Sequence, residues 1–377
     1  MDSILLARGD QADGITKGTV QKAASSSRKW NEFTTQGHLD TFLRDQSESR
    51  VTEIFAAFAH RLRHNYAGKK AQDELRGSSI RAELNSVSAS FKSLGYQDPI
   101  RDHLGKVHRC IRRQLKGYTK KDPPPTQQSP LPISIFTNIK RNYISEVDTA
   151  CSELIEGALF FATRSCEYTK TAAAEAKKTT LLELRDIAFF DQARKSIPQN
   201  SKSLSDKAEF VRITFRLQKN DDNGQEVVLR RSNNLLCGVE AWCNIVTRIR
   251  SYSGTTSRTT VNTYKVGNVF GQITSKQVIS MLRTSVTTIG PENIGVPVKR
   301  VGTHSIRTTF ALLMSLNGAQ DSLIRKKGRW RSDAYLLYIR GYADAFGDMT
   351  SDYISNPEKG NFVSLHDHNH VDELSTR

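Results

Sequence analysis

The sequence predicts a mainly α-helical chain of two domains with one small antiparallel β-sheet, an α+β fold. Three observations predict it. Apolar residues recur at helical spacing through most of the chain, one stretch alternates apolar and polar residues like a β-hairpin, and one proline-rich segment separates two regions. The 377 residues are enough for two domains that each close a hydrophobic core.

The N-terminal third predicts an arm followed by a helical domain. Residues 1–29 mix Gly, Ser, Thr, Lys and Gln with little periodicity, so we expect a flexible arm there. Over residues 30–119, apolar residues recur at helical spacing in two runs, from Val51 to Leu62 and from Leu75 to Phe91. These runs predict a helical bundle.

A proline-rich segment predicts the domain boundary. Residues 120–132 hold five of the ten prolines and show no apolar period. Because proline fixes φ and donates no backbone hydrogen bond, we expect an extended linker. The second domain then covers residues 133–354, and the polar residues 355–377 form a C-terminal tail. The histidine-rich stretch 366–370 in that tail lacks apolar support, so we predict no metal site there.

The second domain combines helical patterns with one β-hairpin signature. Helical spacing begins at Val147 and returns over residues 278–286, 308–316 and 332–340. Between them, apolar and polar residues alternate from Val211 to Leu217, and the pattern resumes at Glu226 after a polar turn that contains Asn223-Gly224. We therefore expect an antiparallel strand pair in an otherwise helical domain.

The charge and the cysteines restrict the class of protein. With 55 Lys or Arg and 39 Asp or Glu, the net charge is 55 − 39 = +16, which indicates an acidic partner such as nucleic acid. The longest apolar stretches are far shorter than the roughly 20 residues of a membrane span. The five cysteines show no Cys-x-x-Cys spacing, which predicts reduced, buried thiols in a soluble, intracellular protein.

One segment of the first domain combines an apolar stripe with dense positive charge. Residues 101–121 hold eight Lys or Arg and a single acid, Asp102. A helix over residues 105–117 would bury Val107, Cys110, Ile111 and Leu115 and expose a cationic face. Such a face is either simply solvated or in contact with phosphates, and the surrounding charge favours phosphates. The candidate DNA-binding residues are Lys106, Arg109, Arg112, Arg113 and Lys116.

A second cationic feature lies near the C-terminal end. His304 and Arg307 are three residues apart at the start of an apolar helical pattern, with Thr303 as the expected N-cap. An imidazole and a guanidinium at a helix N-terminus form a good anion site. His-x-x-Arg alone is weak evidence for a site, because long helical proteins commonly contain such a pair as exposed surface residues.

The motifs around this pair give the chain its resemblance to a known family. Ala162-Thr163-Arg164-Ser165-Cys166-Glu167 lies upstream, and Gly328-Arg329-Trp330 and Tyr338-Ile339-Arg340 lie downstream. In this order the motifs resemble those of the tyrosine recombinases, the phage-integrase-like enzymes. The Gly-Arg-Trp and Tyr-Ile-Arg motifs are most similar to those of Crypton-type recombinases of mobile elements. The residues that match the family's catalytic set span about 175 positions and are Arg164, Lys219, His304, Arg307, Trp330 and Tyr338.

Two positions in the set stay open. The family's His or Trp usually lies about nine residues before the nucleophilic Tyr, whereas Trp330 lies eight before Tyr338, so Arg329 is the alternative. Tyr335 is the rival nucleophile. Glu167, three residues after the first arginine, matches the acidic residue of the family's first box and is expected to orient its basic neighbours.

The resemblance implies a reaction and a way of assembling. The tyrosine would attack a phosphodiester to give a 3′-phosphotyrosine, His304 would act as base or proton shuttle, and Lys219 would protonate the leaving oxygen, without ATP or another cofactor. The implied partner is double-stranded DNA. A helical core-binding domain and a catalytic domain would bind it between them as a clamp. The implied assembly is a homo-tetramer on two DNA sites, joined through residues after Gly341.

Two other functions are consistent with the same residues. A type IB topoisomerase would use a similar Arg, Lys, His and Tyr set. A domesticated regulator would keep the fold and bind DNA without cutting it. The basic clusters fit a nuclear protein as well as DNA contact, so the sequence leaves open the compartment, the target site and the direction of any reaction.

Overall fold

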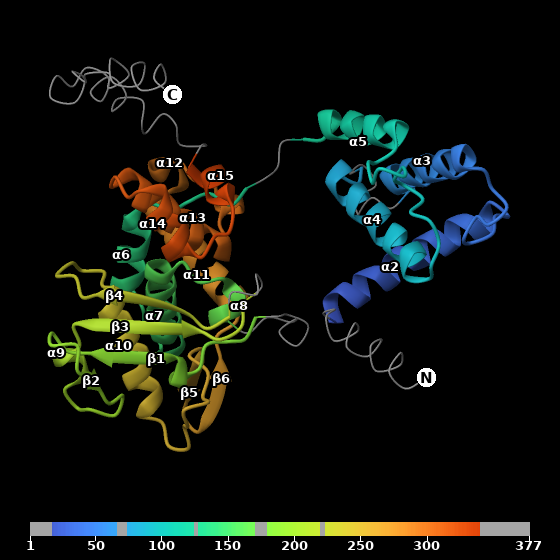
Figure 1. The fold of residues 1–377 in the computed structure, drawn as a ribbon. Helices are drawn as coiled ribbons and strands as arrows, with labels where there is room; N and C mark the ends of the chain where they lie inside the picture. Colours follow the sequence, from blue (N-terminus) through green and yellow to red (C-terminus); the bar gives the residue numbers. More distant parts are fainter. Residues whose placement is uncertain (1–16, 66–73, 124–126, 170–178, 219–222, 340–377) are drawn as a thin grey trace, which may run out of the picture. The chain divides into compact units, whose positions relative to one another are not determined.

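The computed structural model describes residues 17–65, 74–123, 127–169, 179–218 and 223–339; at residues 17, 18, 65, 337 and 338 it describes the helix without the side chain. Among these residues, 17–123 form one unit, and 127–169 with 180–339 form the other. The first unit consists of helices, and the second combines helices with strands (Figure 1). The predicted α+β class, mainly helical with a small antiparallel sheet, is confirmed.

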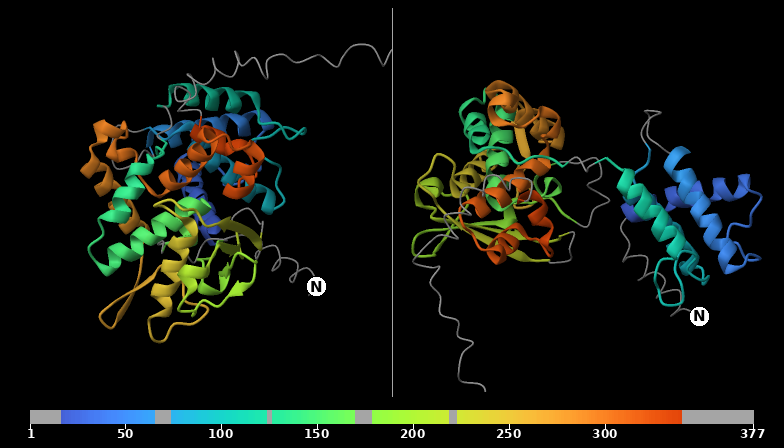
Figure 2. Two further views of the ribbon diagram at one scale, coloured as in Figure 1. Left: turned by 90° about the vertical axis from the view of Figure 1, so that its left-hand side faces the viewer. Right: turned by 90° about the horizontal axis from the view of Figure 1, so that it is seen from above.

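The first unit packs its helices around an aromatic core. The helices are α2 (Lys17–Gln36), α3 (Glu48–Asn65), α4 (Gly77–Ser93) and α5 (Arg109–Lys121), which Figure 2 shows from two further directions. The indole of Trp30 stacks on Phe55 with ring centroids 4.5 Å apart and meets Phe58 edge-on at 5.1 Å. The two apolar runs expected to form helices correspond to α3 and α4.

Helix α2 corrects one expectation. It begins at Lys17, so the prediction of a flexible arm over residues 1–29 is wrong for residues 17–29, while residues 1–16 lie outside the described part of the chain. Lys29 pairs with Glu83 of α4 at 2.5 Å, and Ser26 is buried. Packing against a neighbouring helix stabilises a segment whose own pattern predicts no helix.

Two parts of the expected linker, residues 120–132, belong to the units on either side of it. Residues 120 and 121 form the last turn of α5. Ser129 donates its N–H to the Arg300 carbonyl at 3.0 Å, and Leu131, 2% exposed, donates its N–H to Thr309 Oγ1 at 2.7 Å. Prolines prevent regular structure but do not prevent a leucine from entering a core. Residues 124–126 lie outside the described part.

The second unit places helices against a sheet. Its α-helices are α6 (Ile133–Arg141), α7 (Glu146–Phe161), α8 (Ser165–Tyr168), α9 (Leu204–Lys207), α10 (Gly238–Arg250), α11 (Ser275–Ile289), α12 (Pro291–Ile294), α13 (Thr303–Leu316), α14 (Asp321–Gly328) and α15 (Leu336–Ile339). Among the residues that the structure describes, 3-10 turns accompany them at η2 (Leu184–Asp186), η3 (Val298–Arg300) and η4 (Asp333–Tyr335). Helix α7 approaches α10 closely at Gly157, where a Cβ would lie 2.9 Å from Trp242 Nε1.

The sheet carries the predicted hairpin. Strands β1 (Ile187–Phe190), β2 (Ser196–Ile197), β3 (Phe210–Phe215) and β4 (Gln225–Arg230) are antiparallel in the order β2-β1-β3-β4, and α10 contacts β3 and β4. Their inward side chains, among them Val211 and Ile213, enter the core. A separate hairpin pairs β5 (Thr263–Val266) with β6 (Val269–Gln272). In the part of the chain that the structure describes, no helix is long and apolar enough to cross a membrane.

Candidate active site

The end of α7 positions the first two candidate residues. Ala162 closes the helix in the left-handed region at φ 45°, and the chain then turns into α8 with Arg164 as its N-cap. The backbone N–H of Arg164 donates to Glu167 Oε2 at 2.7 Å, and its Nη1 donates to Oε1 at 2.9 Å. The Glu167 side chain is 1% exposed, whereas that of Arg164 is 17% exposed. The short helix therefore holds one arginine at the surface on a buried carboxylate.

A second arginine binds the same carboxylate. Arg329 donates from Nη1 to Glu167 Oε1 at 2.9 Å and from Nη2 to Oε2 at 2.8 Å, and its guanidinium lies 3.5 Å from the ring centroid of Phe215. Burial acts to raise the pKa of Glu167, but Arg329, followed by Arg164 and Arg307, outweighs it and holds the pKa below its ordinary value. Glu167 is therefore a carboxylate at neutral pH.

The third arginine joins the cluster through backbone carbonyls. Arg307, on α13 and 4% exposed, donates from Nη1 to the Ala162 carbonyl and from Nη2 to the Gly328 carbonyl at 2.9 Å. The Ala162 carbonyl also accepts from Arg329 Nη2 at 3.4 Å. Arg164 Nη2 donates to the Arg329 carbonyl at 3.3 Å. Three guanidinium groups from distant segments thus share partners in one cluster.

His304 lies in the first turn of the helix that carries Arg307. Its backbone N–H donates to Gln128 Oε1 at 2.8 Å, and its side chain is exposed at the surface. Although the residue is exposed overall, neighbouring atoms partly desolvate its ring, and this desolvation, followed by the positive charge of Arg307, lowers the pKa of His304 below its ordinary 6.5. The prediction that Thr303 is the N-cap of this helix is wrong, because Gly302 is the N-cap. The backbone N–H of Gly302 donates to Ser305 Oγ at 3.2 Å.

Arg329 and Trp330, the two alternatives for one position, both lie in this cluster. Arg329 ends α14 in the left-handed region at φ 58°, which turns its side chain toward Glu167. The half-buried ring of Trp330 lies under Arg307, whose guanidinium carbon is 4.6 Å from the ring centroid. A Cβ on Gly328 would lie 1.7 Å from Trp330 Cζ3, so only glycine leaves room for this ring.

The structure describes the side chain of one candidate nucleophile, Tyr335, but not that of the other, Tyr338. Tyr335 is 1% exposed and its ring centroid is 5.8 Å from that of Trp330. Burial, followed by Asp321, raises its pKa. Tyr338 lies in α15, and its side chain is outside the description, as is the whole of Lys219. Of the helix expected over residues 332–340, residues 333–339 form a 3-10 turn followed by this short α-helix, and residue 340 lies outside the described part of the chain.

Sequence reasoning missed Gln218. Its Oε1 accepts from Arg164 Nη1 at 3.3 Å and from Arg329 Nη1 at 3.1 Å, and the residue is 2% exposed. The alternation from Val211 to Leu217 would place Leu217 in the core and Gln218 in the polar turn, but Leu217 is 46% exposed. The strand ends at Phe215, and the alternation ends with it. The only sequence signal was its position directly before the candidate lysine.

The candidate DNA-binding residues lie in the first unit. Helix α5 begins only at Arg109, so Lys106 precedes it in a loop, where its N–H donates to Asp102 Oδ1 at 2.9 Å. Ile111 and Leu115 are buried, but Cys110 is exposed, so the prediction that all five thiols are buried is wrong for it. Cys166 is half-buried. The exposed cations of the helix are Arg109, Arg112, Arg113, Lys116, Lys120 and Lys121.

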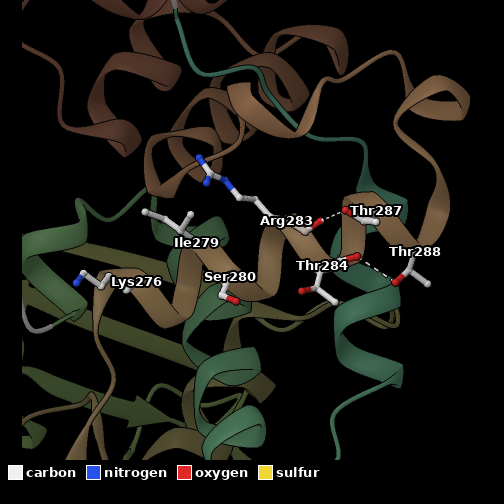
Figure 3. A pocket seen from close by; sticks show the side chains of 7 residues that line it. All are labelled: Lys276, Ile279, Ser280, Arg283, Thr284, Thr287 and Thr288. Carbon is white, nitrogen blue, oxygen red and sulfur yellow. Dashed lines mark hydrogen bonds between the residues drawn. The ribbon is translucent and has the colours of Figure 1, made fainter. Parts of the chain in front are cut away.

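A second cationic face lies on α11 in the other unit. Figure 3 shows a hollow along this helix lined by two cations, hydroxyl side chains and Ile279. Thr287 and Thr288 donate their hydroxyls to the carbonyls of Arg283 and Thr284, both at 3.0 Å. The helix contains no Asp or Glu. Within the described ranges, no group of three or more His, Cys, Asp or Glu side chains could hold a metal ion.

The comparisons with known proteins concern the fold. No family model and no curated protein matches the sequence. The XerH site-specific recombinase, solved in a post-cleavage complex with palindromic difH substrate, is similar with a TM-score of 0.51 and 12% identity over 89% of this chain and 79% of its own. The Tn1549 transposon integrase, with transposon right end DNA, gives a TM-score of 0.43 and 12% identity over 81% and 85%. A lambda integrase dimer on a COC′ core site gives 0.45 and 11% over 90% and 95%.

Proposed function

We propose that this chain, which has the fold of the tyrosine recombinases, cuts and rejoins DNA strands through a covalent 3′-phosphotyrosine intermediate. The observation that carries the proposal is the convergence of Arg164, Arg307 and Arg329 around Glu167. Arg164 and Arg329 are 165 positions apart in the chain. The four side chains carry a formal charge of 3 − 1 = +2, which favours a phosphodiester at this place.

Arg164 is the arginine best suited to touch the scissile phosphate. It is the more exposed of the two guanidinium groups on Glu167, and a guanidinium fork gives two parallel hydrogen bonds to phosphate oxygens. Arg307 and Arg329 add positive charge at short range, which stabilises the extra negative charge of the transition state. Glu167 keeps the guanidinium of Arg164 oriented without cancelling the cluster's charge.

Proton transfers in the proposed reaction fall to three residues. With its pKa lowered, His304 is neutral at pH 7 and can accept a proton, so it serves as base or proton shuttle. Lys219 protonates the leaving 5′ oxygen, and Trp330 donates its indole N–H to a phosphate oxygen. The roles of Lys219 and Trp330 are carried over from the resemblance of their positions to the family's motifs.

We propose Tyr338 as the nucleophile. The rival Tyr335 is buried with a raised pKa, so its phenol is a poor nucleophile that would have to leave its packing against Trp330. The phosphotyrosine bond conserves the energy of the broken phosphodiester, so the second transfer restores DNA without an external energy source. This division into two transfers matches a protein that moves DNA strands between sites.

The proposed partner is double-stranded DNA. The exposed cations of α5 and the acid-free face of α11 support phosphate contact by both units, which would close on the duplex as a clamp. The integrase-like reaction, the origin in a mobile element of the Crypton kind, the homo-tetramer on two DNA sites and the nuclear location are parts of the same proposal. Cross-linking on DNA, with and without residues 355–377, tests whether that tail joins the subunits.

Covalent capture tests the proposal. The wild type is incubated with nicked duplexes of randomised sequence, and adducts that survive denaturation are sequenced, which also reveals the target site. We expect adducts from the wild type and from Tyr335→Phe, and none from Tyr338→Phe. DNA binding by the wild type without any adduct would refute the proposal and support the regulator.

The same preparation separates the recombinase from a type IB topoisomerase. Supercoiled plasmids that carry one or two copies of the captured site are incubated with the protein. A recombinase joins two sites and changes the plasmid's connectivity. Relaxation alone, at equal rates with one site or two, would support the topoisomerase.

A further inference from the structure

The β3–β4 hairpin is tied to the segment that carries Arg329. Lys327 Nζ donates to the Val228 carbonyl of β4 at 2.8 Å, and Gln225 Nε2 lies 3.5 Å from the Lys326 carbonyl. The third link, between Gln218 and Arg329 Nη1, is buried. The hairpin and the end of α14 therefore form one connected body beside the arginine cluster.

Gln218 is the link that reaches the arginines themselves. Its Oε1 accepts from Arg164 and Arg329, its Nε2 donates to Gln225 Oε1 at 3.1 Å, and its N–H donates to Asn223 Oδ1 at 3.0 Å. Because the amide nitrogen is engaged by Gln225, the amide oxygen is held toward the two guanidinium groups. A buried amide with both ends engaged has one orientation.

We infer that Gln218 is a positioning residue, which holds the guanidinium of Arg164 at the scissile phosphate with a neutral acceptor. The inference rests on the proposed function. Glu167 already supplies one negative charge, and a second carboxylate at this place would reduce the cluster's formal charge from +2 to +1. An amide orients both guanidinium groups and leaves the positive charge for the phosphate.

Two substitutions separate orientation from charge. Gln218→Met keeps the length and the neutral charge but removes the acceptor, so the bound guanidinium groups lose a shared partner. Gln218→Glu keeps the acceptor and adds a charge. The matched control is Gln199→Ala in the same unit, which removes hydrogen bonds to the Leu184 and Ile187 carbonyls and touches no arginine of the cluster.

The measurement is the single-turnover rate constant of adduct formation on the captured nicked duplex. This rate constant does not depend on the fraction of folded protein, which the amplitude reports. We expect Gln218→Met to be slower by about 10- to 100-fold, since it loses hydrogen bonds to charged groups. We expect a similar loss for Gln218→Glu, because its added negative charge offsets part of the positive charge that stabilises the transition state. Gln199→Ala should stay within about twofold of the wild type, because its contacts lie outside the site.

A second substrate excludes a merely structural effect. A methylphosphonate at the scissile position lacks the negative charge that the arginines neutralise, so the deficit of Gln218→Glu should fall to about threefold or less. A deficit of Gln218→Glu that persists unchanged on this substrate, or rates of both variants within twofold of the wild type on the phosphodiester, would overturn the inference. Absence of any adduct from the wild type would instead refute the proposed function and the inference with it.

Discussion

Replacing Glu167 by glutamine tests how the arginine cluster is held together. Each carboxylate oxygen accepts two hydrogen bonds: Oε1 from Arg164 Nη1 and Arg329 Nη1, both at 2.9 Å, and Oε2 from the Arg164 N–H at 2.7 Å and Arg329 Nη2 at 2.8 Å. A glutamine presents an NH2 group in place of one oxygen. Two donors then face a donor, whichever way the amide turns.

The expected loss is large because both partners are buried. The side chains of Glu167 and Arg329 are each 1% exposed, and removing one partner leaves an uncompensated buried cation, which typically costs about 3–5 kcal/mol. For a unit of about 150–250 residues, 1 kcal/mol lowers Tm by about 2–4 °C, so we expect a decrease of about 6–20 °C. Adding Arg329→Met should restore part of the loss, because it removes the unpaired cation.

Thermal and urea unfolding, followed by circular dichroism, measure the effect. The control is Glu226→Gln, whose carboxylate is 47% exposed and lies 3.5 Å from Arg212, where the expected loss is about 0–1 kcal/mol. The pKa of Glu167 is lowered, so its stabilisation is complete above its ordinary pKa of 4.5 and is lost as the pH falls through the folded pKa. Equal losses for the two variants at pH 7 would refute the buried-pair reasoning.

Three further outcomes follow. His304 must be neutral to accept a proton and its pKa is lowered, so the rate of adduct formation should fall only below pH 6.5; a decline that begins above pH 6.5 and disappears in His304→Gln would contradict this. Gly328→Ala should displace the Trp330 ring and destabilise the second unit by about 1–3 kcal/mol, measured by urea unfolding, and an unchanged midpoint would contradict the close contact. Removing three exposed cations of α5 should reduce the slope of log K against log[salt] by about 3 in fluorescence-anisotropy titrations, and an unchanged slope would show that the helix does not contact phosphates; the substitutions are Arg109→Ala, Arg112→Ala and Lys116→Ala.

The order of the motifs predicted that Arg164 and Arg307 lie near each other. Arg164 and Glu167 are three residues apart at the start of a short helix, and local spacing alone brings their side chains together. The pairing of β3 with β4 was equally local, because alternation and an Asn-Gly turn encode it. The family resemblance linked these pieces to Arg307 across the chain, and the structure brings them together.

Other features depended on contacts that no local pattern contains. The sequence predicted a flexible arm for residues 17–29 because their helix is stabilised by contacts with a neighbouring helix and not by their own pattern. The end of the expected linker is ordered because Leu131 is buried in the core of the second unit. Arg329 and Trp330 were alternatives in the sequence, whereas both lie in the cluster and do different things there: one binds Glu167 and the other packs on Arg307.

The sequence by itself determined the helical patterns, the hairpin, the positive charge and the order of the motifs, because each of these is written in residue type and short-range spacing. Only the tertiary structure decided which polar side chain is shared by two guanidinium groups and which of them is buried. Gln218 shows the reason: whether an amide faces solvent or two arginines depends on where a strand ends and on residues about a hundred positions away, and neither property is local.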